Sequence, residues 1–227
     1  MGCGDGFFTS LLGEHRVEVI GVDNSEAFLR EAQVTTANAT NVEVLEGDAR
    51  QLPRDDASTD VVWSAHSMHS YPDVQKCLRE FRRILRPGGT LAVLESDNVH
   101  SVMLSWSPDL ELAVRQAEHR EIGDEDSYIG TYFPRFATRV LTEIGFEEIT
   151  PQYFFIHRLG PAGESLTEFV KLYLESLLER TSDQLTEKMR SKLAVLADPC
   201  SDKFLPRQKP FFFGSLQALI LARAVKP

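Results

Sequence analysis

Short apolar runs alternate with amphipathic stretches along the first half of the chain. The runs are bounded by turn-forming residues and are too short for helices, so they predict buried strands. They cover residues 16–23, 42–46, 60–64 and 90–95. Between the last two, residues 74–85 repeat apolar side chains at helical spacing and keep arginines on the other face. This alternation predicts an α/β fold with a doubly wound, mostly parallel sheet.

The second half of the chain predicts closing strands separated by helical insertions. Residues 96–130 and 160–210 are the insertions, and we expect them to form a lid and a substrate pocket. Strands are expected at residues 147–157 and 211–224, with the last strand antiparallel beside its predecessor. We therefore predict a single domain over residues 1–227, with residues 1–95 as its ligand-binding half.

Charge and hydropathy exclude several classes of function. The chain of 227 residues has a formal net charge of −10, which disfavours nucleic acid, because binding to phosphates depends on lysine and arginine. A small molecule is the expected partner. No apolar run approaches the roughly 18 residues of a membrane span, and the first residues do not resemble a signal peptide. The oligomeric state is left open.

The cysteines indicate the compartment. Cys3, Cys77 and Cys200 are far apart and lack the spacing of metal ligands, so neither a disulfide framework nor a metal site is expected. We expect a cytoplasmic protein.

Candidate chemistry begins with the first residues of the chain. Gly2, Gly4 and Gly6 stand at alternate positions and allow a sharp backbone turn that a ligand can approach closely. Asp23 ends the next predicted strand, about twenty residues after the loop begins, where nucleotide-binding folds hold ribose hydroxyls. The pattern indicates a nucleoside-containing ligand.

Four segments together resemble class I S-adenosylmethionine-dependent methyltransferases, a family with a Rossmann-like fold, and more closely the branch that methylates small molecules. The resemblance runs from Gly2 to about Glu95. The segments are residues 2–6, residues 21–25, residues 47–49, and residues 60–73 together with 85–89. The resemblance implies that the chain uses S-adenosylmethionine and transfers its methyl group to a small molecule.

The resemblance also implies residues that bind the cofactor. The glycine loop lies against the methionine part, the acidic residue after the next strand binds both ribose hydroxyls, and the later Asp and its neighbour meet the adenine. Carried onto this sequence, the predicted cofactor-binding residues are Gly2, Cys3, Gly4, Asp23, Asn24, Asp48, Ala49, Ser64 and Ala65.

The chemistry of the cofactor supports these assignments. A carboxylate such as Asp23 accepts hydrogen bonds from two hydroxyls, and such charge-assisted bonds are roughly twice as strong as neutral ones. Asp48 can accept a hydrogen bond from the adenine amine, although without the other segments a helix cap is the preferred interpretation. The loop has no lysine, as expected for a cofactor without phosphate.

Candidate catalytic residues follow the strand at residues 60–64. His69 and His66 are the first candidates for a general base, since histidine titrates near neutral pH. The alternative, a packed or helix-capping histidine, is equally consistent with the sequence. Glu95 and His100 follow the next strand and are expected to face the substrate. The alternative for Glu95 is an ion pair with a surface arginine. The spacing of the two histidines does not predict a metal site.

Two other functions remain open from the sequence. One is a nicotinamide-dependent oxidoreductase, which is disfavoured because Phe7 stands where the dinucleotide motif would want a later glycine. The other is a non-catalytic subunit that binds the cofactor or a partner. The family also places a central strand directly before the glycine loop, and this sequence has no residues for it. We therefore expect either that Met1 is an internal methionine or that the sheet lacks this strand.

Overall fold

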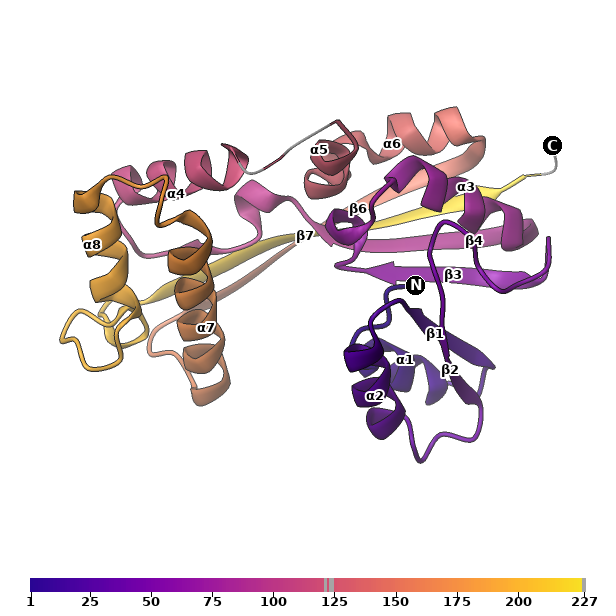
Figure 1. Cartoon of the computed structure of the whole chain (residues 1–227), viewed down its shortest axis with the longest axis horizontal. Coiled ribbons are helices and arrows are strands. Elements are labelled where there is room, and N and C mark those ends of the chain that lie inside the picture. The colour runs from indigo at the N-terminus through magenta and orange to yellow at the C-terminus, as the bar shows by residue number, and fades with distance from the viewer. Residues whose placement is uncertain (121, 123–124, 226–227) are drawn as a thin grey trace. The chain divides into compact units, whose positions relative to one another are not determined.

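The computed structural model describes residues 1–120, 122 and 125–225 (Figure 1). The chain divides into two compact units. Unit 1 comprises Met1–Asp97, Glu125–Tyr153 and Gln217–Pro227, and unit 2 comprises Asn98–Asp124 and Phe154–Leu216. Unit 2 thus covers residues 98–124 and 154–216, whereas the predicted insertions cover residues 96–130 and 160–210. That the insertions form a lid and a substrate pocket within a single domain stays a prediction.

The N-terminal part of unit 1 is a small parallel sheet with two helices. Strand β1 (Val19–Asp23) pairs in parallel with β2 (Val42–Glu46). Helix α1 (Phe7–Gly13) follows the glycine loop, and α2 (Glu26–Thr35) connects the two strands. Strand β1 is shorter than the predicted residues 16–23. Arg16 has a φ of 57°, which no extended strand adopts, and the carbonyl of Val17 accepts a hydrogen bond of 2.6 Å from the side chain of Asn41.

The rest of unit 1 is built on a second sheet. Strand β3 (Thr59–Ala65) pairs in parallel with β4 (Leu85–Ser96), and β4 pairs antiparallel with β7 (Phe212–Ala224). Strand β6 (Phe146–Leu159) pairs with β7. The parallel pairs and the antiparallel last strand confirm the predicted α/β fold.

Helices cover this second sheet. Helix α3 (Val74–Ile84) carries the predicted apolar face, and its residues Cys77, Leu78 and Phe81 are fully buried. Helices α5 (Glu125–Thr131) and α6 (Phe133–Ile144) contact α3. A short 3₁₀ turn, η1 (Met68–Ser70), lies between β3 and α3.

The two sheets of unit 1 meet at the start of the chain. Among the strands that the structure describes, β1 pairs with β2 and not with β3. The amide of Cys3 donates to the carbonyl of Val22 at 3.0 Å, and the N-terminal amine of Met1 donates to the carbonyl of Trp63 at 2.6 Å. Residues 1–3 therefore bind to both β1 and β3. Whether a further strand precedes them stays a prediction.

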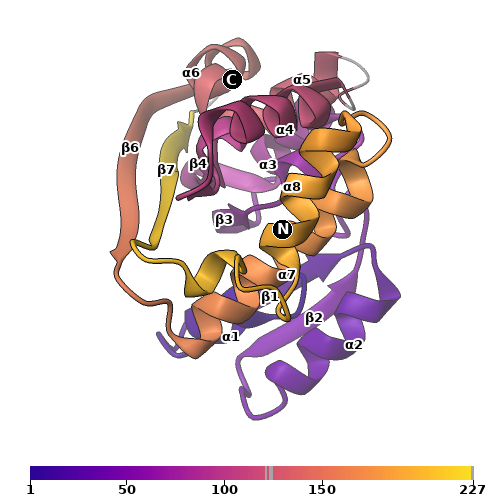
Figure 2. The ribbon, with the colours of Figure 1, turned by 90° about the vertical axis from the view of Figure 1, so that its left-hand side faces the viewer.

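Unit 2 is mainly helical. It contains η2 (Asn98–His100), β5 (Met103–Leu104), α4 (Pro108–Arg120), α7 (Glu164–Thr181), α8 (Glu187–Ala197) and η3 (Leu205–Arg207). Figure 2 shows α7 and α8 side by side, and both contact α4. Their apolar faces form a core that contains Val114, Leu174 and Leu193. The core of unit 1 shares no residue with it.

Some elements differ from the sequence prediction. Helix α8 begins at Glu187 within the second predicted insertion, because the hydroxyl of Thr186 accepts a hydrogen bond from the amide of Met189 and so caps the helix there. Elements β5, α5 and the 3₁₀ turns were not predicted, since none is long enough to show a periodic pattern.

Candidate functional site

The glycine loop has the geometry that glycine allows. Gly2, Gly4 and Gly6 have φ angles of 61°, 53° and 83°, a region that other residues enter at a cost. At Gly2 space is also limited, because a Cβ would lie 2.5 Å from the Oγ of Ser67. At Gly4 nothing lies within 4 Å of such a Cβ. The loop is therefore packed on one side and open at its middle glycine.

The carboxylate of Asp23 organises this loop. One oxygen accepts a hydrogen bond of 2.9 Å from the amide of Gly4, and the other accepts one of 3.0 Å from the amide of Ser25. A carboxylate offers about four acceptor positions, so room remains for two more donors. Asp23 is half-buried and the neighbouring Asn24 is exposed. The predicted pair of glycine loop and acidic residue is thus in direct contact.

Cys3 takes part in the loop mainly through its backbone. Its carbonyl accepts a hydrogen bond of 3.0 Å from the amide of Gly6. Burial, and then the charge of Asp23, raise the pKa of its thiol. Cys3 is therefore a neutral thiol at neutral pH.

Asp48 and Ala49 lie just after β2. Arg50 donates hydrogen bonds to both carboxylate oxygens of Asp48, the shortest of them 2.6 Å. Because of these bonds the pKa of Asp48 falls to about 2. Ala49 is partly buried against the core. A ligand amine at Asp48 would compete with Arg50.

Ser64 and Ala65 end strand β3. Ser64 is fully buried, and its hydroxyl lies 3.1 Å from the hydroxyl of Tyr71. Burial raises the pKa of Tyr71, so this hydroxyl stays protonated. The side-chain hydroxyl of Ser64 therefore contacts Tyr71.

His66 precedes the turn η1, and His69 lies within it. His66 has a φ of 51° and its amide donates to the carbonyl of Leu94 at 2.9 Å. Both histidines have exposed surface, yet partial desolvation lowers the pKa of each ring, and the charge of His69 lowers that of His66 further. Neutral imidazoles accept protons, which the role of general base requires.

Glu95 lies at the end of β4 and is only 3% exposed. Its Oε1 accepts hydrogen bonds from the amides of Ser67 and Met68, at 2.7 and 2.8 Å. Burial raises the pKa of this carboxyl group to about 7. The carboxylate is directed at the protein backbone, whereas the sequence suggested a side chain facing substrate or a surface arginine. His100 lies in η2 of unit 2.

Two residues at the site were missed from the sequence. The hydroxyl of Ser67 donates to the carbonyls of Gly2 and Ala65, at 3.3 and 2.8 Å. Tyr71 contacts Ser64 from the same segment. Both residues follow the strand predicted at residues 60–64, but nothing in the sequence indicated which atoms their hydroxyl groups would reach.

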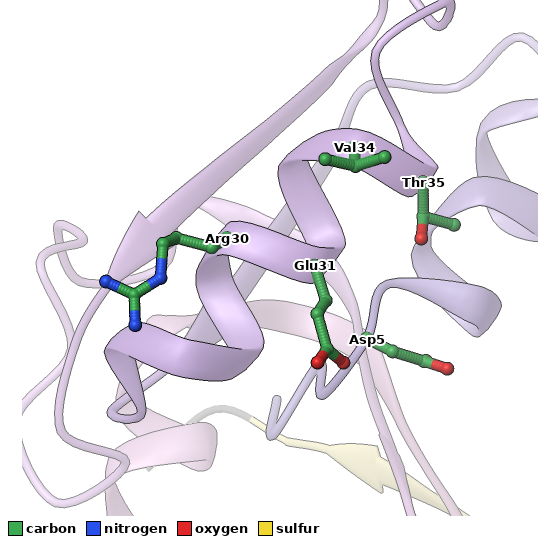
Figure 3. Close-up of a pocket in the computed structure, with 5 residues that line it drawn as sticks. All are labelled: Asp5, Arg30, Glu31, Val34 and Thr35. Atoms are coloured by element: carbon green, nitrogen blue, oxygen red, sulfur yellow. The ribbon is translucent and has the colours of Figure 1, made fainter.

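A shallow depression lies beside the glycine loop. It is lined by Asp5 and by Arg30, Glu31, Val34 and Thr35 of α2. Figure 3 shows Arg30 pointing away from Glu31 and Asp5, and its guanidinium pairs with Glu26 at 2.8 Å. The depression presents two carboxylates and contains none of the predicted site residues.

Two searches of the described residues bear on metals and membranes. Over residues 1–120, 122 and 125–225, no three His, Cys, Asp or Glu side chains gather as metal ligands would. Within the same ranges, every helix is too short or too polar to cross a membrane.

Comparison with known proteins concerns mainly the first part of the chain. Residues 1–93 match the family model described as a methyltransferase domain. The demethylmenaquinone methyltransferase of Staphylococcus carnosus is 39% identical over 79 residues, which cover 35% of this chain and 33% of that relative. The chain therefore matches about a third of the relative's length.

Solved structures resemble the whole chain. The YcgJ protein of Bacillus subtilis has a TM-score of 0.61 and 18% identity, covering 100% of this chain and 90% of that one. The phosphoethanolamine N-methyltransferase 2 of Haemonchus contortus, solved with phosphomonomethylethanolamine and S-adenosylhomocysteine, has a TM-score of 0.54 and 17% identity over 99% of this chain and 48% of that one. At these identities the likeness concerns the fold.

Proposed function

We propose that this chain transfers a methyl group from S-adenosylmethionine to a small-molecule acceptor, because residues 1–93 match the family model described as a methyltransferase domain. The observation that carries the proposal is the contact between Asp23 and the glycine loop. The amide of Gly4 donates to Asp23 at 2.9 Å, so one carboxylate both shapes the loop and keeps acceptor positions for ribose hydroxyls.

The residues present fit this cofactor. Asp23 would hold the ribose, the loop at Gly2, Cys3 and Gly4 would lie against the methionine part, and Asp48 with Ala49 would meet the adenine. Asn24, Ser64 and Ala65 would complete the site. When bound, S-adenosylmethionine supplies a sulfonium methyl group that an acceptor attacks in line, with S-adenosylhomocysteine as the product.

The protein's contribution would be alignment and, where needed, proton removal. Holding two reactants in line lowers the entropic part of the barrier. If the acceptor must lose a proton, His69 or His66 would take it, since the lowered pKa of each ring keeps it neutral and able to accept. That His100 faces the substrate stays a prediction.

A small acceptor is supported by the relatives and by the charge of the chain. The Staphylococcus carnosus relative is named for a quinone substrate, and the net charge of −10 does not favour a nucleic acid. The three free cysteines, one of them the exposed Cys200, fit a reducing compartment. We therefore propose a cytoplasmic enzyme acting on a small molecule.

The test is binding of S-adenosylhomocysteine by calorimetry. We expect the unaltered chain to bind, and Asp23→Ala to weaken binding by about a hundredfold, because two charge-assisted hydrogen bonds are worth about 3 kcal/mol together. Asp183→Ala, an exposed position in unit 2, is the matched control and should bind as the unaltered chain does. Equal affinity of Asp23→Ala would remove Asp23 from the site.

A ligand comparison separates the alternatives. S-adenosylhomocysteine should raise the melting temperature of the chain, since a ligand that binds only the folded state stabilises it. NAD at the same concentration should leave it unchanged. The reverse result would favour the nicotinamide-dependent oxidoreductase.

A further inference from the structure

Glu95 is a buried residue whose carboxylate accepts hydrogen bonds from backbone amides. It lies in β4 and is 3% exposed. Its Oε1 accepts hydrogen bonds from two successive amides, those of Ser67 at 2.7 Å and Met68 at 2.8 Å. Two donors converging on one oxygen define the position of the backbone between them more tightly than one bond does.

These amides lie between the two histidines, His66 before them and His69 in the turn η1. Met68 starts η1 and is fully buried in the core of unit 1. His66 precedes the two amides with a φ of 51°, a conformation that needs support from its surroundings. His69 follows within the turn. The hydrogen bonds to Glu95 therefore fix the backbone between the two histidines.

The same turn also touches the glycine loop. The hydroxyl of Ser67 donates to the carbonyl of Gly2 at 3.3 Å, and a Cβ on Gly2 would lie 2.5 Å from that hydroxyl oxygen. A shift of Ser67 would thus displace Gly2 or open a gap beside it. The chain of contacts runs from Glu95 through Ser67 to the loop.

We propose that Glu95 is a positioning residue, which holds Ser67 and Met68 so that the glycine loop and the two histidines are set relative to each other. It acts through the turn and does not touch the reactants. Its consequence for catalysis rests on the proposed function, whereas its effect on the turn does not.

The electrostatics of Glu95 agree with a positioning role. Burial raises the pKa of its carboxyl group to about 7, although three backbone hydrogen bonds, from Met68, Ser67 and Ser96, oppose that rise. The buried charge therefore weakens the folded state at neutral pH. The positioning role therefore rests on the two hydrogen bonds from Ser67 and Met68, and not on a gain in overall stability.

The first test measures the turn itself, without any cofactor. Amide hydrogen exchange at Ser67 and Met68 should speed up by at least tenfold in Glu95→Ala, because each bond to a charged acceptor is worth about 1.5 kcal/mol or more. Glu95→Gln keeps an acceptor oxygen and should retain part of the protection. The amide of Val93 in β4 is the internal reference and should change little.

A second buried glutamate supplies the matched control. Glu118, 6% exposed, lies in α4 of unit 2, and Glu118→Gln should leave the exchange of Ser67 and Met68 unaltered. Unchanged exchange at both amides in Glu95→Ala, with the protein folded, would overturn the proposal. Equal acceleration in Glu118→Gln would also overturn it, since the effect would then be general loss of stability.

The second test measures function. Glu95→Ala should raise the dissociation constant for S-adenosylhomocysteine by about tenfold, with Glu95→Gln in between, at a temperature where all variants are folded. In methyl transfer, we expect a larger loss in kcat than in KM for the acceptor, because the histidines are displaced as well. If the unaltered chain binds no S-adenosylhomocysteine, the proposed function fails, and the exchange data alone decide the role of Glu95.

Discussion

Gly2 shows how a single residue connects two parts of the site. It combines a φ of 61° with a close approach to Ser67, so a side chain there meets both backbone strain and a steric clash. Asp23 also connects two segments, because one carboxylate oxygen binds the glycine loop and the other binds the start of α2. The sequence identified both residues, but only the packing shows why Gly2 has no substitute.

We predict that Gly2→Ala destabilises the protein more than Gly88→Ala does. Both glycines have a positive φ, but a Cβ at Gly88 has nothing within 4 Å. Gly88→Ala should cost about 1–2 kcal/mol from backbone strain, and Gly2→Ala a further ~1–3 kcal/mol from the clash. Urea unfolding measures both. Equal costs would show that the loop moves away from Ser67 freely.

We predict that Glu95 makes stability depend on pH. Its pKa in the folded state is raised from 4.5 to about 7. Its favourable contribution to the free energy of unfolding is therefore fully present below pH 4.5 and is lost as the pH rises through 7. The loss amounts to about 3 kcal/mol at most, at 1.36 kcal/mol per pKa unit.

The measurement is the difference in unfolding free energy between Glu95→Gln and the unaltered chain from pH 5.5 to pH 8. Other titrating groups are common to both proteins and cancel. The stability of the variant relative to the unaltered chain should rise across this range. A difference that stays constant with pH would contradict the raised pKa.

The elements of unit 1 follow their local sequence closely. Helix α3 begins where the side chain of Asp73 accepts a hydrogen bond of 2.8 Å from the amide of Lys76, and its apolar face is buried as the spacing predicts. The turn before it does not follow from local sequence. Residues 66–70 are held by a carboxylate from β4, which lies 27 or 28 positions away along the chain.

We predict that Asp73→Ala destabilises the protein by about 1 kcal/mol, the usual value of an N-cap. Asp73→Asn should recover most of this loss, because asparagine also accepts the hydrogen bond. Asp60→Ala, which removes an exposed carboxylate that pairs with Arg86 at 2.8 Å, should cost less than 0.5 kcal/mol or so. Thermal unfolding of the three variants would reveal a different order if the cap were unimportant.

On the scale of the whole molecule, the chain has two cores. The core of unit 1 contains the strands that carry the predicted site, and that of unit 2 is formed by α4, α7 and α8 with their connecting segments. Unit 2 also holds a buried polar network. Arg115 binds Glu118 at 2.8 Å and the hydroxyl of Tyr173 at 3.2 Å, and Arg180 binds Glu118 at 3.2 Å.

We predict that Arg115→Met destabilises the protein by about 3–5 kcal/mol, because it leaves the buried Glu118 without its main partner. The double variant Arg115→Met/Glu118→Leu should be less destabilised, since neither charge then stays buried alone. Affinity for S-adenosylhomocysteine should change less than twofold in folded protein, as the glycine loop belongs to the other core. Chemical unfolding and calorimetry measure these effects, and a double variant as unstable as the single one would show that the pair itself is not the cause.

The elements of residues 1–95, the predicted cofactor half, were predictable from the sequence because their signals are local. A glycine loop, an acidic residue after the next strand and a periodic helix are each written in a few consecutive residues, and their order alone indicated the family. Outside this half the predictions were weaker. The helices of unit 2 were expected, but β5 and α5 were not, and the start of α8 depends on the cap at Thr186.

By itself, the sequence determined the main strands and helices of residues 1–95, the loop that glycine requires and the carboxylate Asp23 beside it, since each depends on neighbouring residues. Tertiary structure decided the partners. In the folded chain Asp48 binds Arg50, the hydroxyl of Ser64 contacts that of Tyr71, and Glu95 accepts hydrogen bonds from the amides of Ser67 and Met68. A carboxylate reads the same in sequence whether it meets solvent, an arginine or two backbone amides, and only folding brings one of these within hydrogen-bonding distance.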